Sequence, residues 1–168
     1  MPADLASEDL ANEIEQLLAA TEQTQQELAG LYRGKRAAIR RADGLEIARL
    51  TQIEEKLVAR LKAHIHRRNE ILQRMKAAGT AADSLATLVR TLAPSRQKGL
   101  LAQIEQTRRT AEANRRESWI VWIVSKQSLR LFAEMRELIA NGGRRAPVYS
   151  ARSEAETSFG GAILDASA

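Results

Sequence analysis

Apolar side chains recur at alternating steps of three and four residues along most of the chain, the spacing that places them on one face of an α-helix. The first series predicts a helix from about Ser7 to Arg41. We call the positions on this face the seam. Because three seam positions of this helix are polar, we interpret it as a wall of a bundle rather than as half of a dedicated coiled-coil dimer. The seam consists of Leu10, Ile14, Leu17, Thr21, Thr24, Leu28, Leu31, Lys35 and Ala38.

A second helix is predicted between Asp43 and Gly79. Asp43 and Glu46 have the spacing of a capping box, in which the first acid accepts free backbone amides and the second folds back. Gly79 is typical of a helix C-terminus. Since the connection is only a few residues long, the first two helices should form an antiparallel hairpin. The second seam reads Ile47, Leu50, Glu54, Leu57, Leu61, His64, Arg68, Ile71 and Met75.

Two further helices are expected after this hairpin. Asp83 can cap a short third helix with the apolar stripe Leu85, Leu88, Val89 and Leu92, which Pro94 stops or kinks. A last long helix is predicted from Ser95 to about Ala140. The expected fold class is therefore all-α: an elongated antiparallel helical bundle, or coiled-coil hairpin, with a long C-terminal helix. The last seam reads Leu100, Ile104, Thr107, Ala111, Asn114, Ser118, Val121, Ser125, Leu129, Phe132, Met135 and Ile139.

The stretch from Trp119 to Val124 departs from this spacing, because all six of its residues, WIVWIV, are apolar. In a helix such a run covers the whole circumference and leaves no polar face. Three interpretations remain open: burial inside the chain's own bundle, a surface for a partner, or an isolated strand, since these residue types also favour strands. The run is far shorter than the roughly 20 residues that span a bilayer. Its large side chains lie on faces that a three-helix bundle leaves exposed, which favours a partner surface.

Composition and the end of the chain add the domain boundaries. Ala, Leu, Glu, Gln, Lys and Arg dominate and aromatic residues are few, as in long helices. After Ala140 the periodicity ends and Ser, Ala and Gly prevail, so residues 1–140 are predicted to form the helical domain and residues 141–168 a flexible tail. The acidic start lacks the apolar segment of a secretory signal and the chain has no cysteine, so a cytoplasmic location is expected.

Charge is unevenly distributed along the sequence. The net charge is +5, yet the first 30 residues carry seven acids and no base. This pattern fits either an acidic arm with a nucleic-acid-binding body, or acids of the first helix lying beside the basic end of the second. We favour the second explanation, since both placements also suit the helix dipoles. The basic residues concerned are Arg60, Lys62, Arg67, Arg68, Arg74 and Lys76.

No pattern in the sequence indicates catalysis. His64 and His66 are two residues apart and point to different sides of a helix, unlike the pair of a zinc-binding helix, so His64 is expected to be a packed or boundary residue. There is no Gly-rich phosphate loop and no spacing that suggests a catalytic triad. We expect no enzyme activity, no cofactor and no metal. The basic doublets are interleaved with acids and alanine rather than aromatic residues, so nucleic acid is not the expected partner.

The order of these elements resembles the FlgN family of flagellar export chaperones, over roughly residues 23–150. The stretches that carry the resemblance are ELAGLYRGKRAAIRRADGLEIARLTQIEEKLVARL (27–61), TLVRTL (87–92), the apolar segment from Asn114 to Leu129, and VYSAR (148–152). Family members often carry a second asparagine three residues after the first, where this chain has Glu117.

The resemblance implies a cytoplasmic helical chaperone without nucleotide hydrolysis. Such a protein binds the C-terminal helical segments of hook-associated (hook–filament junction) proteins, prevents their premature assembly and delivers them to the type III export gate. On this pattern the C-terminal half binds cargo and Tyr149 docks on the gate. Together with the apolar run, this predicts the cargo-binding residues Asn114, Ser118, Trp119, Val121, Trp122, Ser125, Leu129 and Phe132.

Two alternatives remain. One is a self-associating structural coiled-coil protein, in which the surface from Trp119 to Val124 closes a homodimer. The other is a basic helical nucleic-acid-binding protein. A homodimer in the absence of cargo is also compatible with the chaperone hypothesis, whereas membrane insertion is not expected.

Overall fold

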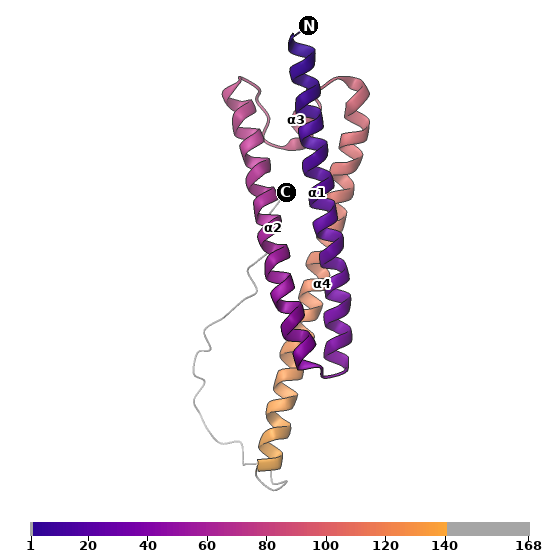
Figure 1. Ribbon diagram of the computed structural model, residues 1–168, viewed down its shortest axis with the longest axis vertical. Helices are drawn as coiled ribbons and strands as arrows, with labels where there is room; N and C mark the ends of the chain where they lie inside the picture. Colours follow the sequence, from indigo (N-terminus) through magenta and orange to yellow (C-terminus); the bar gives the residue numbers. More distant parts are fainter. Residues whose placement is uncertain (1, 141–168) are drawn as a thin grey trace.

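The computed structural model of the chain describes residues 2–140, which fold into four helices and contain no strand. They are α1 (Pro2–Arg40), α2 (Gly44–Ala77), α3 (Leu85–Val89) and α4 (Pro94–Ala140). The three long helices run alongside one another in an elongated bundle, and α1 and α2 form an antiparallel hairpin (Figure 1). The predicted all-α fold is therefore confirmed. The predicted tail, residues 141–168, lies outside the described residues.

The helix ends explain how the chain turns. The N–H of Glu46 donates to Asp43 Oδ1 at 3.0 Å, which confirms Asp43 as the cap of α2. The reciprocal half of the predicted capping box is wrong, because the Glu46 carboxylate accepts two hydrogen bonds from Arg49 instead, each of 2.7 Å. At the other end, α2 stops just before Gly79, whose φ of +88° is the left-handed conformation that glycine adopts readily.

The short helix α3 begins one residue later than its predicted cap implies. Ser84, not Asp83, is the N-cap, and its side chain accepts a 3.2 Å hydrogen bond from the N–H of Thr87. A hydroxyl and a carboxylate cap equally well, so adjacent candidates could not be separated by residue type. Pro94 is the first residue of α4, a position where the missing N–H has no cost.

Helix α1 is the centre of the bundle. It packs along both α2 and α4, whereas α2 and α4 make no extensive contact with each other. This requires a second buried stripe on α1 beside the predicted seam, and Ala11, Leu18, Gln25 and Tyr32 supply it at seven-residue spacing. This stripe was not among the predicted seams, although the repeat of seven is visible in the sequence.

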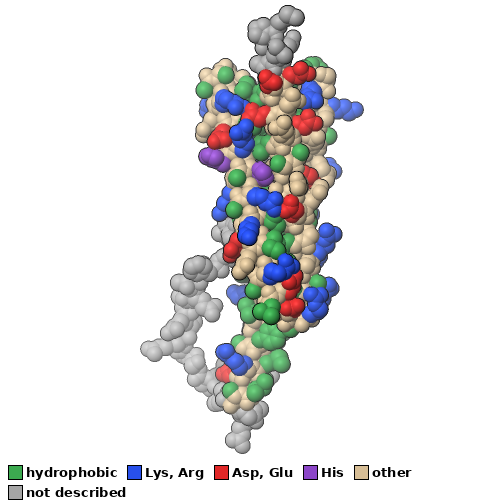
Figure 2. Space-filling view, in the orientation of Figure 1, with side chains coloured by type: hydrophobic (Ala, Val, Ile, Leu, Met, Phe, Trp, Pro, Cys, Tyr) green, Lys and Arg blue, Asp and Glu red, His purple; other side chains and the backbone are tan. Residues whose placement is uncertain are grey.

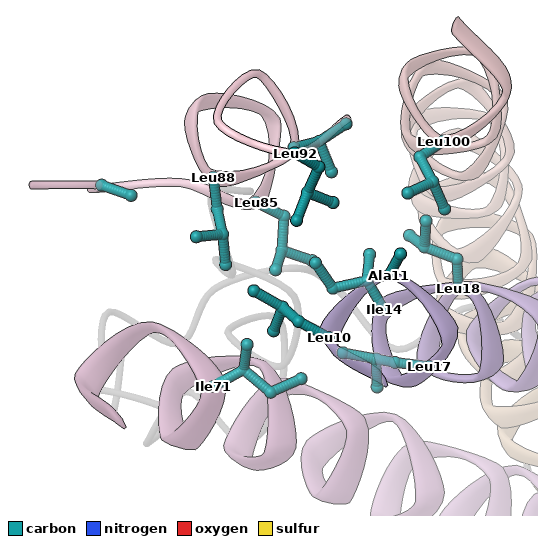
Figure 3. Packing of buried hydrophobic residues seen from close by; sticks show 12 residues of the cluster. Leu10, Ala11, Ile14, Leu17, Leu18, Ile71, Leu85, Leu88, Leu92 and Leu100 are labelled. Carbon is teal, nitrogen blue, oxygen red and sulfur yellow. The ribbon is translucent and has the colours of Figure 1, made fainter. Parts of the chain in front are cut away.

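The apolar core consists of two separate clusters. We call the first the α3-end cluster, where α3 fills the space between the N-terminal half of α1, the end of α2 and the start of α4 (Figure 3). The second, the turn-end cluster, lies near the α1–α2 turn. The α3-end cluster contains Leu10, Ala11, Ile14, Leu17, Leu18, Ile71, Ala82, Leu85, Leu88, Val89, Leu92 and Leu100. The turn-end cluster contains Leu28, Leu31, Tyr32, Ala38, Leu50, Leu57 and Val121.

Polar contacts lie between the two clusters. Asn114 Nδ2 donates to the backbone oxygen of Gln25 at 2.7 Å, and His64 Nε2 lies 3.2 Å from Thr24 Oγ1. His64 is thus a boundary histidine, as predicted. Buried polar groups are tolerated when they are hydrogen-bonded, and their directionality fixes the register of packed helices.

Ion pairs join α1 to α2 as the charge pattern predicted. Glu13 pairs with both Arg67 and Arg74, and Glu27 pairs with Arg60. These arginines are more than half exposed, so each pair contributes little to stability. Their placement nevertheless confirms that the acidic N-terminal helix lies beside the basic end of the second helix.

Candidate partner-binding surface on the last helix

Helix α4 continues past the turn that joins α1 to α2 (Figure 1). Val121 is its last buried residue, and no residue from 122 to 140 is buried. We call residues 122–140 the overhang. At 1.5 Å per residue it is about 28 Å long. The predicted seam of the last helix therefore runs on beyond the end of the hairpin that it packs against.

Apolar side chains are concentrated on and just before the overhang. Trp119 is 48% exposed and Trp122 is 41% exposed, although tryptophan is usually well covered. Figure 2 shows hydrophobic side chains gathered on this end of the molecule, whereas charged and other side chains cover much of the visible body. The other large exposed apolar residues here are Ile120, Ile123, Val124, Leu129, Leu131, Phe132, Met135 and Ile139.

This exposure decides between the interpretations of the WIVWIV run. The run is helical, so the strand alternative is wrong. Apart from Val121, its side chains are exposed in the single chain, so burial in the chain's own bundle is wrong as well. A contiguous apolar surface of this kind is typical of a site that another molecule covers.

The exposed residues form two faces of α4. Ile123 lies about 200° around the helix from Val121, whereas Phe132 returns to within about 20° of it. We call Ser125, Ser128, Phe132, Met135 and Ile139 the seam face, and Trp119, Ile120, Trp122 and Ile123 the tryptophan face.

The tryptophan face has a defined local arrangement. The rings of Trp119 and Trp122 meet edge to face, with centroids 5.4 Å apart and an interplanar angle of 81°. Lys126 Nζ lies 5.3 Å from the centroid of the Trp122 ring, within the range of a cation–π contact. Aromatic side chains with few rotatable bonds lose little entropy when a partner covers them.

The predicted cargo-binding residues divide by burial. Trp119, Trp122, Leu129 and Phe132 are exposed, and Ser118 and Ser125 are half-buried. Asn114 and Val121 are buried against the bundle, and Asn114 already donates to Gln25. These two residues therefore position α4 on α1 rather than face solvent. Tyr149, predicted to dock on the export gate, lies outside the described residues.

Several exposed residues were not among the predicted binding residues. Ile120 and Ile123 belong to the apolar run itself, and Leu131, Met135 and Ile139 follow it along the helix. For Met135 and Ile139 the signal was present, because the seam spacing continues through residue 139 whereas the hairpin opposite ends near residue 41.

A buried ion pair joins α1 to α2. Lys35 is 6% exposed and its ammonium pairs with the Glu54 carboxylate. The neighbouring Tyr32 belongs to the turn-end cluster. Burial, and then the nearby Glu54 carboxylate, raise the pKa of the Tyr32 hydroxyl well above its usual value of 10, so the hydroxyl keeps its proton.

Many of the arginines in the described chain are paired with carboxylates. Glu117, for example, lies 3.0 Å from Arg36 and joins α4 to α1. Nucleic-acid-binding surfaces instead present unpaired arginines and lysines to phosphates. Arginines with a carboxylate partner are Arg36, Arg49, Arg60, Arg67, Arg74, Arg96, Arg108, Arg109 and Arg130.

Neither a metal site nor a bilayer span is found in the part of the chain that the structure describes. No three His, Asp or Glu side chains there come close enough to hold a metal ion. None of its helices combines the length and apolar character needed to cross a membrane.

His64 should make stability depend on pH. Burial, and then the nearby Arg60, lower the pKa of its imidazole below the usual 6.5, so the unfolded chain takes up the proton first as pH falls. Stability is therefore expected to decrease as pH falls below about 6.5. Thermal unfolding at pH 7.5 and pH 5.5 measures this. His64→Gln should reduce the difference in stability between the two pH values.

Comparison with known proteins gives no identification, since no family model, curated protein or solved structure matches the chain.

Proposed function

We propose that this protein is a chaperone that binds an amphipathic helical segment of another protein along α4. The observation that carries this proposal is the exposed tryptophan face, together with the exposed end of the seam. A helix that presents apolar residues on more than one side can be covered by a partner helix packed lengthwise against it, as in helix-in-groove recognition.

The particular partner follows from the resemblance to the FlgN family of flagellar export chaperones. On that basis the cargo is the C-terminal helical segment of a hook-associated protein, and the chaperone delivers it to the type III export gate in the cytoplasm. Trp119, Trp122, Leu129 and Phe132 would contact the cargo directly. Asn114 and Val121 would support the site by holding α4 on α1. Tyr149 is the proposed contact with the gate.

Binding of this kind needs no enzymatic step. The chaperone shields the apolar face of the cargo by burying it against its own exposed face, and releases it when a competing surface takes over. The paired arginines argue against the nucleic-acid alternative, since their charge is already compensated by carboxylates.

The proposal predicts that Trp122→Asp weakens binding of a peptide from the C-terminal helix of a hook-associated protein at least about 30-fold. A tryptophan at the centre of an interface contributes about 2 kcal/mol or more, and a charge in its place must be desolvated. Calorimetric titration measures the affinity. Since Trp122 is 41% exposed, helicity and thermal unfolding should remain nearly unchanged.

Leu45→Asp provides a matched control. Leu45 is an apolar residue of α2 that is 88% exposed and outside the proposed site, so this variant should bind the peptide like the parent. Equal binding by the Trp122 variant would place the cargo elsewhere. Absence of binding by the parent chain would contradict the proposed cargo. Binding that weakens steeply with salt would favour a charged partner such as nucleic acid.

A further inference from the structure

The seam face of the overhang changes in side-chain size along its length. Its first two positions, Ser125 and Ser128, are small, and its last three, Phe132, Met135 and Ile139, are large. The two serines are half-buried, whereas the three large residues are exposed and have no cover within the described chain. Well-packed helices place large residues opposite small ones.

We propose that the overhang pairs with the overhang of a second copy of this chain, with the two helices antiparallel. In one register of this pairing, a small residue lies opposite a large one at two places in each copy. This register places Ser128 against Phe132 of the second copy and Ser125 against Met135 of the second copy. Parallel pairing would instead stack serine on serine and phenylalanine on phenylalanine.

The positions beside the seam fit this occupant. Trp122 and Leu129 follow one margin, and Val124, Leu131 and Leu138 follow the other. Arg136 is the sole charged residue among the margin positions between 121 and 139, so the pairing brings no like charges together along the margins. In the antiparallel register Arg136 comes close to Trp122 of the second copy, where its guanidinium can stack on the indole ring.

The fold also limits how far the pairing extends. Antiparallel overhangs bring the end of each α4 toward the α1–α2 turn of the other copy, where each hairpin ends. The paired stretch is therefore the overhang itself, about 28 Å long. In a two-fold interface every contact occurs twice, so each overhang covers the seam face of the other.

This pairing does not depend on the proposed chaperone function. It leaves most of the tryptophan face outside the interface, but it covers Ser125, Leu129 and Phe132, which the cargo site shares. Cargo and the second copy would then compete for these positions. Self-association is measured without cargo, so its failure leaves the chaperone proposal untouched, and failure of peptide binding leaves the pairing untouched.

Light scattering of the purified full chain tests the pairing. The expected mass at high concentration is twice the 18.6 kDa of one chain, decreasing on dilution. Phe132→Asp should raise the dissociation constant at least about 30-fold. Ile123→Asp is the matched control: Ile123 is also an exposed apolar residue of α4, but on the opposite side, so its variant should dimerise normally. A monomer at every concentration, or equal loss in both variants, would overturn the proposal.

Disulfide cross-linking tests the orientation, since the chain has no native cysteine. The double variant Ser125→Cys, Met135→Cys should form a covalent dimer on oxidation. Neither single variant should do so. Antiparallel pairing places residue 125 or 135 of one copy about ten residues along the axis, or about 15 Å, from the same residue of the second copy. Efficient cross-linking of the single variants would show parallel pairing and would overturn the proposed orientation.

Discussion

Replacing Glu54 with alanine is expected to lower the free energy of unfolding by about 3 kcal/mol. The substitution leaves the Lys35 ammonium, which is 6% exposed, without its carboxylate partner. A buried charge that loses its partner typically costs 3–5 kcal/mol, and the lower end applies because Glu54 is itself about a quarter exposed. Urea unfolding followed by circular dichroism measures the change.

The double variant Lys35→Met, Glu54→Leu separates charge from packing. Removing both charges should restore most of the lost stability, because apolar residues of similar size often replace a buried ion pair without cost. If the double variant is as unstable as Glu54→Ala, lost packing rather than the unpaired charge explains the effect. A loss below about 1 kcal/mol for Glu54→Ala would show that water solvates Lys35.

Leu88→Ala should have an effect of similar size, about 3 kcal/mol. Leu88 is fully buried in the α3-end cluster, and truncating a buried leucine typically costs 2–5 kcal/mol. Helix α3 has only five residues and cannot be stable by itself, so its position depends on the burial of Leu85, Leu88 and Val89. Thermal or urea unfolding measures the loss.

A leucine outside the core provides the comparison. Leu45→Ala, at a position that is 88% exposed, should change the stability by less than about 0.5 kcal/mol. If both leucine variants lose stability equally, the effect does not come from the α3-end cluster. If neither does, α3 is not held by its apolar side chains.

Seam spacing was sufficient to predict the helices and the hairpin, because a period of three and four residues requires a helix with one buried face. It also placed the acids of α1 beside the arginines of α2, which the ion pairs of Glu13 and Glu27 confirm. Cap identity was harder: Ser84 and Asp83 are adjacent and equally suited, and only the backbone geometry selects Ser84.

The candidate surface was predicted in part. Six consecutive apolar residues indicated a face that the bundle could not cover, and the exposure of Trp119 and Trp122 agrees with that interpretation. The spacing could not show that the hairpin ends before the seam does, because periodicity gives the direction of a side chain but not what lies opposite it. Asn114 was predicted to bind cargo from the resemblance to the FlgN family, whereas in the structure its amide donates to the carbonyl of Gln25.

The central position of α1 also bears on how the bundle opens. Away from α3, α2 and α4 are each held mainly by α1, so either can separate from it while the other remains packed. Partial unfolding therefore has two independent routes, one for each outer helix, and the polar contacts of His64 and Asn114 lie one on each route. The chain is in this respect two helical pairs that share one member, and its cooperativity depends on α3, which contacts both outer helices at one end.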